Sequence, residues 1–127
     1  MSQISEKEVL KKILTACEDA KAIDPIILDM SGLVNLTDKF VIASGRSDRH
    51  VIGIANRIKS DLRDVKIKPL VMEGMNKAHW VLMDYEQIVV HIFYESAREL
   101  YDLEGLWSKA KKIKPSAILG KSAQAAA

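Results

Sequence analysis

Apolar residues recur at helical spacing in two stretches of the chain, and each stretch predicts an amphipathic helix. The first helix begins at Ser5, which forms a capping box with Glu8, and it ends before Pro25. The second begins at Ser47 or Asp48, either of which can cap its first turn. The apolar stripe of the first helix comprises Leu10, Ile13, Leu14 and Cys17. The stripe of the second comprises Val51, Ile54, Ala55, Ile58 and Leu62.

Short apolar runs predict five strands, at residues 26–30, 40–43, 70–72, 80–85 and 88–94. The run at 40–43 is apolar at every position, which is typical of a central strand covered on both faces. A helix joins this strand to the next one, so the two can lie parallel. Only Glu86 and Gln87 separate the last two strands, which predicts an antiparallel hairpin.

A third helix follows, for which Ser96 and Glu99 form a second capping box. Its apolar stripe comprises Leu100, Leu103, Trp107 and Ala110. The order of elements predicts an α/β chain (α+β mixed) with a mixed sheet of about five strands flanked by helices. A length of 127 residues fits one domain, which we place at residues 1–113. We expect residues 114–127 to form a basic, disordered tail.

Charge is distributed unevenly along the chain. Residues 1–108 hold 14 Lys/Arg and 17 Asp/Glu, a net charge of −3, whereas residues 109–127 hold five lysines and no acid. A mildly acidic body suits a basic protein partner better than a nucleic acid, which selects a basic face. No apolar run reaches the roughly 18 residues that span a bilayer, and the N-terminus lacks an apolar signal core. The single cysteine excludes a disulfide framework, and we expect a cytoplasmic protein.

The turn at residues 44–48, between a buried strand and a helix, is the candidate for chemistry. A helix N-terminus with free N–H groups can bind phosphate, and a similar turn opens the active site of nucleotidyltransferases. Their metal also needs paired carboxylates on a nearby strand. No such pair lies on a predicted strand; Asp102 and Glu104 lie on a helix, where residues two apart point about 200° apart. We therefore predict no catalytic residue, metal or cofactor, and keep an enzyme that binds or transfers nucleotides through the Ser44–Asp48 turn as the alternative.

Both tryptophans lie within residues 80–107. Strand alternation places Trp80 on one face with Leu82 and Asp84. If Trp80 lies near outward-facing residues of the third helix, the result is an aromatic, partly acidic patch of the kind that protein interfaces use. We expect Trp80 at such an interface and Trp107 in the core.

Six segments carry a family resemblance, in order and at matching spacing over about residues 5–110. They read LTDKFVIASG at 36–45, SDRHV at 47–51, EG at 73–74, WVLMDY at 80–85, VVH at 89–91 and RELYDLEGLW at 98–107. Together they resemble the ribosomal silencing factors, the Iojap-like proteins. The resemblance implies a nucleotidyltransferase-like fold that lacks the catalytic carboxylates, and a protein that is not an enzyme.

The resemblance also implies a partner. Members of the family bind the large ribosomal subunit through its protein numbered fourteen and block joining of the small subunit, which represses translation when nutrients are short. The matching positions here are Trp80, Asp84, Tyr85, Tyr101, Leu103, Glu104 and Leu106. Trp80 matches the tryptophan of that contact, and the others are not divided between contact and core. A phosphate contact of the lysine-rich tail with ribosomal RNA and a homodimer through the aromatic patch both stay open.

Overall fold

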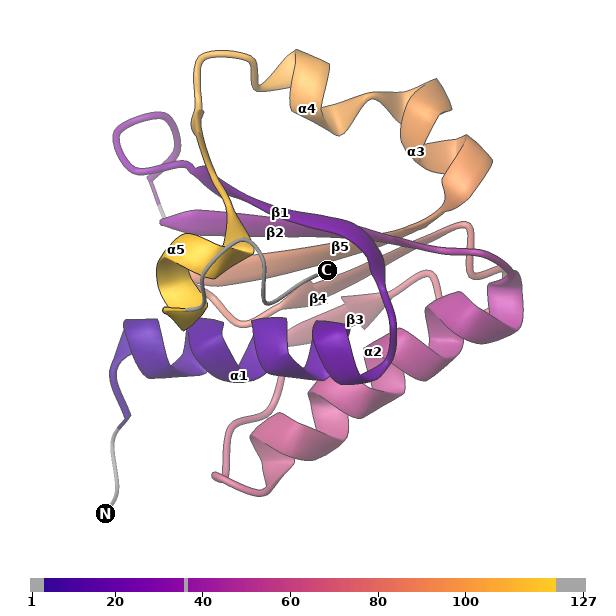
Figure 1. Ribbon diagram of the computed structural model, residues 1–127, viewed down its shortest axis with the longest axis horizontal. Coiled ribbons are helices and arrows are strands. Elements are labelled where there is room, and N and C mark those ends of the chain that lie inside the picture. The colour runs from indigo at the N-terminus through magenta and orange to yellow at the C-terminus, as the bar shows by residue number, and fades with distance from the viewer. Residues whose placement is uncertain (1–3, 36, 121–127) are drawn as a thin grey trace.

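The computed structural model describes residues 4–35 and 37–120, which form a six-stranded mixed sheet between two layers of helices (Figure 1). The strands are β1 (Ile23–Asp29), β2 (Lys39–Gly45), β3 (Val71–Glu73), β4 (Trp80–Asp84), β5 (Ile88–Tyr94) and β6 (Lys111–Ile113). Their order across the sheet is β3-β4-β5-β2-β1-β6. The predicted fold class is confirmed, with one strand more than expected.

The centre of the sheet is the parallel pair of β2 and β5. The other neighbouring pairs of the described sheet are antiparallel. Residues 41–45 of β2 and 88–93 of β5 are all buried, so the predicted central strand is confirmed. The β4–β5 hairpin is confirmed as well, and Glu86 in its turn has a φ of 76°. β3 lies at the sheet edge beside β4 and does not pair with β2.

Two long helices, α1 (Glu6–Asp19) and α2 (Asp48–Arg63), cover one face of the sheet (Figure 1). Both begin as predicted: Ser5 and Glu8 form the capping box of α1, and the Ser47 hydroxyl accepts a hydrogen bond from the N–H of His50. All residues of the two predicted apolar stripes are buried in the core beneath them. Cys17 is fully buried there, and burial raises the pKa of its thiol to about 12.

Two short helices, α3 (Glu95–Tyr101) and α4 (Leu103–Leu106), cover the opposite face (Figure 1). They enclose a second core, which comprises Leu28, Met30, Ile42, Phe93, Ala97, Leu103 and Ala110. The expected capping box of Ser96 and Glu99 is wrong, because α3 begins at Glu95 directly after β5 and no side chain caps it. The prediction of one continuous third helix is also wrong, since the chain bends at Asp102.

The C-terminal part of the described chain adds two elements that the sequence pattern did not predict. β6 pairs with β1, and helix α5 (Pro115–Leu119) follows it. Ile118 and Leu119 pack against the core beneath α1, where we expected a disordered tail from residue 114. The remaining tail residues, 121–127, lie outside the described residues. None of the helices in residues 4–35 and 37–120 has the length and apolar character needed to cross a membrane.

Candidate partner-binding surface

Trp80 begins β4 and lies on the sheet face that carries α3 and α4. Its ring centroid is 5.0 Å from that of Phe93 in the second core and 5.0 Å from that of Tyr101 at the end of α3. The side chain is half-buried. Trp80 therefore joins the sheet to the helical layer, and it serves both the core and the surface rather than the surface alone.

The indole of Trp80 is held by His91 on the neighbouring strand. Trp80 Nε1 donates a hydrogen bond to His91 Nδ1 over 3.1 Å, which places the proton of the neutral imidazole on Nε2. His91 is 4% exposed, and burial lowers its pKa to about 4. Its ring also packs edge-on against Phe40, at a centroid distance of 4.6 Å. The tryptophan is thus fixed by a neutral, buried acceptor, which gives His91 a structural role.

The bend between α3 and α4 is made by two residues. Asp102 has a left-handed backbone (φ 46°, ψ 54°), and its Oδ1 accepts a hydrogen bond from the N–H of Gly105 over 3.1 Å. A Cβ on Gly105 would lie 2.2 Å from Asp102 Oδ2, so a larger residue here would displace the Asp102 carboxylate from this position. The left-handed residue ends one helix and caps the next. The bend turns Leu100 outward while Leu103 stays in the core.

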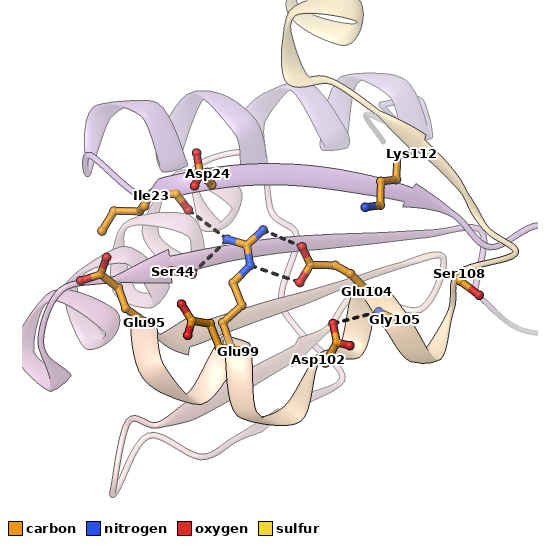
Figure 2. Close-up of a pocket in the computed structure, with 11 residues that line it drawn as sticks. Ile23, Asp24, Ser44, Glu95, Glu99, Asp102, Glu104, Gly105, Ser108 and Lys112 are labelled. Atoms are coloured by element: carbon orange, nitrogen blue, oxygen red, sulfur yellow. Dashed lines mark hydrogen bonds and ion pairs between the residues drawn. The ribbon is translucent and has the colours of Figure 1, made fainter.

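Arg98 clamps this bend to the sheet through Glu104, Ser44 and Ile23, which are labelled in Figure 2. Its Nε and Nη2 donate to the two carboxylate oxygens of Glu104, over 3.3 and 3.1 Å. Its Nη1 donates to Ser44 Oγ over 2.9 Å and to the carbonyl of Ile23 over 3.2 Å. The side chains of Arg98 and Glu104 are only 13% and 22% exposed. One guanidinium therefore ties α3 to α4, β1 and β2 at once, and the carboxylate of Glu104 is occupied within the fold.

A cavity of about 600 Å³ opens beside this clamp. Acidic side chains dominate its lining (Figure 2): Asp24, Glu95, Glu99, Asp102 and Glu104. Residues 95–106 contain four acids and only one base, Arg98. The layer formed by α3 and α4 is therefore acidic.

Exposed apolar side chains gather on the same helical layer. Leu100 is 78% exposed, Tyr101 53% and Leu106 73%. The sequence pattern placed Leu100 in the core, which is wrong because the bend at Asp102 interrupts the helical register. The sequence feature that could have predicted the exposure of Leu100 is Gly105, because glycine weakens a continuous helix. Trp107 lies half-buried at the edge of the second core, with its ring edge-on to Phe40 at 6.2 Å, close to the core position expected for it.

Two of the candidate contact residues lie away from this layer. Asp84 ends β4, and its Oδ1 accepts a hydrogen bond from the N–H of Glu86 over 2.7 Å, which holds the hairpin turn. Tyr85 packs against the core on the face of α1 and α2. Its hydroxyl is buried without a hydrogen-bond partner among the described residues, and burial raises its pKa to about 12. The structure thus places Trp80, Tyr101, Leu103, Glu104 and Leu106 in or against the layer of α3 and α4, but not Asp84 and Tyr85.

Both serines of the turn at residues 44–48 have structural partners. Ser44 is 3% exposed and accepts from Arg98, and Ser47 caps α2. His50 accepts from the N–H of Arg46 and contacts the carbonyl of Ala20 through its other ring nitrogen. In the part of the chain that the structure describes, no three His, Cys, Asp or Glu side chains are grouped so that they could hold a metal ion. The turn therefore begins α2 and connects its first turn to the C-terminal end of α1.

Comparisons with known proteins agree with the earlier resemblance. The model of the family described as ribosomal silencing factor during starvation matches residues 3–127. A ribosomal silencing factor of Bacillus subtilis is 40% identical over 107 residues, which cover 84% of this chain and 91% of that protein. A crystal structure of a protein from Chromobacterium violaceum is similar with a TM-score of 0.80 and 34% identity, covering 83% of this chain and 88% of the other.

A more distant relative is the mouse protein named mitochondrial assembly of ribosomal large subunit protein 1. It is 28% identical over 108 residues, which cover 83% of this chain and 47% of the mouse protein. Taken together, the fold and the comparisons define a mixed α/β protein whose curated bacterial relatives are named ribosomal silencing factors. The chain belongs to the family of ribosomal silencing factors.

Proposed function

We propose that this silencing factor binds the large ribosomal subunit through the ribosomal protein numbered fourteen, and that the bound factor blocks joining of the small subunit. The mechanism needs occupancy alone, without catalysis or a cofactor, and we place it in the cytoplasm. An interface of standard size, roughly 1,200–2,000 Å² in total, suffices to hold the factor on the joining face. The dissociation rate then sets how long a subunit stays silenced.

The observation that carries this proposal is the exposed apolar surface of α3 and α4. Leu100, Tyr101 and Leu106 are each more than half exposed, and Trp80 packs against Tyr101 from the sheet. Apolar and aromatic side chains of this kind anchor protein interfaces, and the surrounding acids favour a basic partner such as a ribosomal protein. We assign the contact to Trp80, Leu100, Tyr101 and Leu106. Leu103 and Glu104 lie on the inner side of the layer of α3 and α4 and hold it in position.

The structure decides which substitution tests the contact. Trp80→Ala would remove ring contacts to Phe93 and Tyr101 as well as the hydrogen bond to His91, so it changes stability together with binding. Leu106→Ala removes an exposed side chain instead. We expect it to weaken co-sedimentation with purified large subunits about five- to thirtyfold, the effect of losing roughly 1–2 kcal/mol at an interface. Its thermal unfolding should match that of the wild type.

The matched control is Leu70→Ala, which removes a leucine of similar exposure (67%) from the segment just before β3. It should co-sediment like the wild type. Equal binding by the Leu106 variant would remove α4 from the contact. If light scattering showed that both the wild type and the Leu106 variant form dimers through this layer, the surface would be serving self-association instead.

A further inference from the structure

A second candidate binding surface lies where β3 forms one edge of the sheet, next to α2 (Figure 1). Leu70 and Val71 are 67% and 42% exposed there. A groove of about 470 Å³ runs between this edge and the C-terminal half of α2. It is lined by Lys59, Arg63, Ile67, Lys68, Pro69 and Met72. The floor of the groove is aliphatic and its rim is cationic.

The positive charge of this rim is available to a partner. Lys59, Arg63, Lys66 and Lys68 are all exposed, and none of the four forms an ion pair with another described residue. The nearby Asp61 is already paired with Arg57, at a nitrogen–oxygen distance of 3.1 Å. Residues 59–73 hold four bases and three acids, and the groove lining holds three bases and no acid, so the groove is basic while the layer of α3 and α4 is acidic.

We propose that this edge is a second docking site, which binds an extended acidic segment of a partner protein as an additional strand on β3. Alternate backbone N–H and C=O groups of an edge strand have no partner within the sheet and can pair with an added strand. Alternate side chains of that strand would point toward α2. Apolar ones fill the groove over Ile67 and Met72, and acidic ones contact Lys59 and Lys68.

Two other occupants fit the edge less well. Single-stranded RNA binds through stacking of bases on aromatic rings, and the lining of the groove contains only aliphatic and cationic side chains. A second copy of this chain that paired edge to edge would bring two cationic rims together, which is unfavourable. An acidic, partly apolar peptide complements both the positive charge of the rim and the aliphatic floor of the groove. The site is separate from the surface of α3 and α4 and does not depend on the function proposed for it.

The test uses the full chain and a short synthetic peptide with serine at every second position, in which the intervening positions are alternately glutamate and valine, so that both residue types lie on the strand face that points toward α2. Fluorescence anisotropy measures its binding. The same peptide with lysine in place of glutamate and an oligouridylate serve as competing probes. The double variant Lys59→Glu/Lys68→Glu should bind the acidic peptide roughly tenfold more weakly, because each reversal replaces a weak attraction with repulsion. Lys7→Glu/Lys11→Glu, on the exposed side of α1, is the matched control and should bind like the wild type.

Amide hydrogen exchange separates strand addition from simple charge attraction. Bound peptide should slow exchange at residues 71–73, and Leu106→Ala should leave this protection unchanged. The proposal is overturned by binding without protection at 71–73, by tighter binding of the oligouridylate, by equal loss of binding in the Lys7/Lys11 control, or by no binding of the acidic peptide. None of these outcomes bears on the binding of the large subunit through α3 and α4.

Discussion

Trp80 shows how one residue can link the stability of the sheet to the shape of a surface. Its ring is shared between Phe93 in the core and the exposed Tyr101, and its N–H is fixed by His91. The sequence alone posed a choice between core and interface for this residue. Strand alternation could place the ring on a face, but only the packing of α3 against that face shows that Trp80 contacts the core and also reaches the surface.

At this scale the protonation of His91 gives a testable prediction. Burial lowers the pKa of His91 from 6.5 to about 4, so the unfolded chain takes up a proton here more readily than the folded protein. The contribution of this site to stability is therefore complete above about pH 6.5 and is lost as the pH falls toward 4. At about 1.4 kcal/mol per pH unit, we expect a loss of about 2 kcal/mol between about pH 7.5 and pH 5.

Urea unfolding of the wild type and of His91→Gln isolates this contribution. Glutamine can still accept the hydrogen bond from Trp80 but does not titrate, so the free energy of unfolding of the variant should fall less over the same pH interval. Parallel pH profiles for the two proteins would mean that His91 is protonated alike in the folded and unfolded states.

Among the elements, the bend of α3 and α4 determines which side chains are presented. Arg98 engages Glu104, Ser44 and the Ile23 carbonyl together, so it fixes the bend relative to two strands. Removing one partner of a largely buried ion pair leaves the other charge without compensation. Arg98→Ala should therefore lower the free energy of unfolding by about 2 kcal/mol or more.

A double-mutant cycle of Arg98→Ala and Glu104→Ala, measured by urea unfolding, should give a coupling energy of about 1 kcal/mol. The pair Arg57 and Asp61 on α2 is the control, because it is more exposed, at 45% and 27%. Its cycle should give at most about 0.5 kcal/mol. Equal coupling energies in the two cycles would show that the Arg98–Glu104 pair behaves like an ordinary surface ion pair and does not hold the bend in place.

The same elements show where the sequence was sufficient. The starts of α1 and α2, their buried stripes and the β4–β5 hairpin follow from local patterns, and all were predicted. The bend at Asp102 was not, since it is held by Arg98 contacts to Ser44 and Ile23, which are 54 and 75 positions away in the chain. β6 was missed for the same reason: it is three residues long and gains its hydrogen bonds from β1. The same limit applied to the candidate site. Leu100 is exposed because of the bend, and the local sequence pattern did not predict the bend.

For the whole molecule, the sheet separates surfaces of different character. One face carries an acidic, apolar layer on α3 and α4, and the β3 edge beside α2 is basic and aliphatic. A protein that works by occupancy needs a rigid body to present such surfaces. The two cores on either side of the sheet hold the elements together, and we propose that the helical layer makes the contact.

The most direct test of this account follows the joining of ribosomal subunits by light scattering after purified large and small subunits are mixed. With saturating wild-type factor bound to the large subunits, we expect joining to be suppressed. Leu106→Ala, added at the same concentration, should suppress it less, and Leu70→Ala should act like the wild type. Joining at an unchanged rate and extent with the wild-type factor bound would contradict the account.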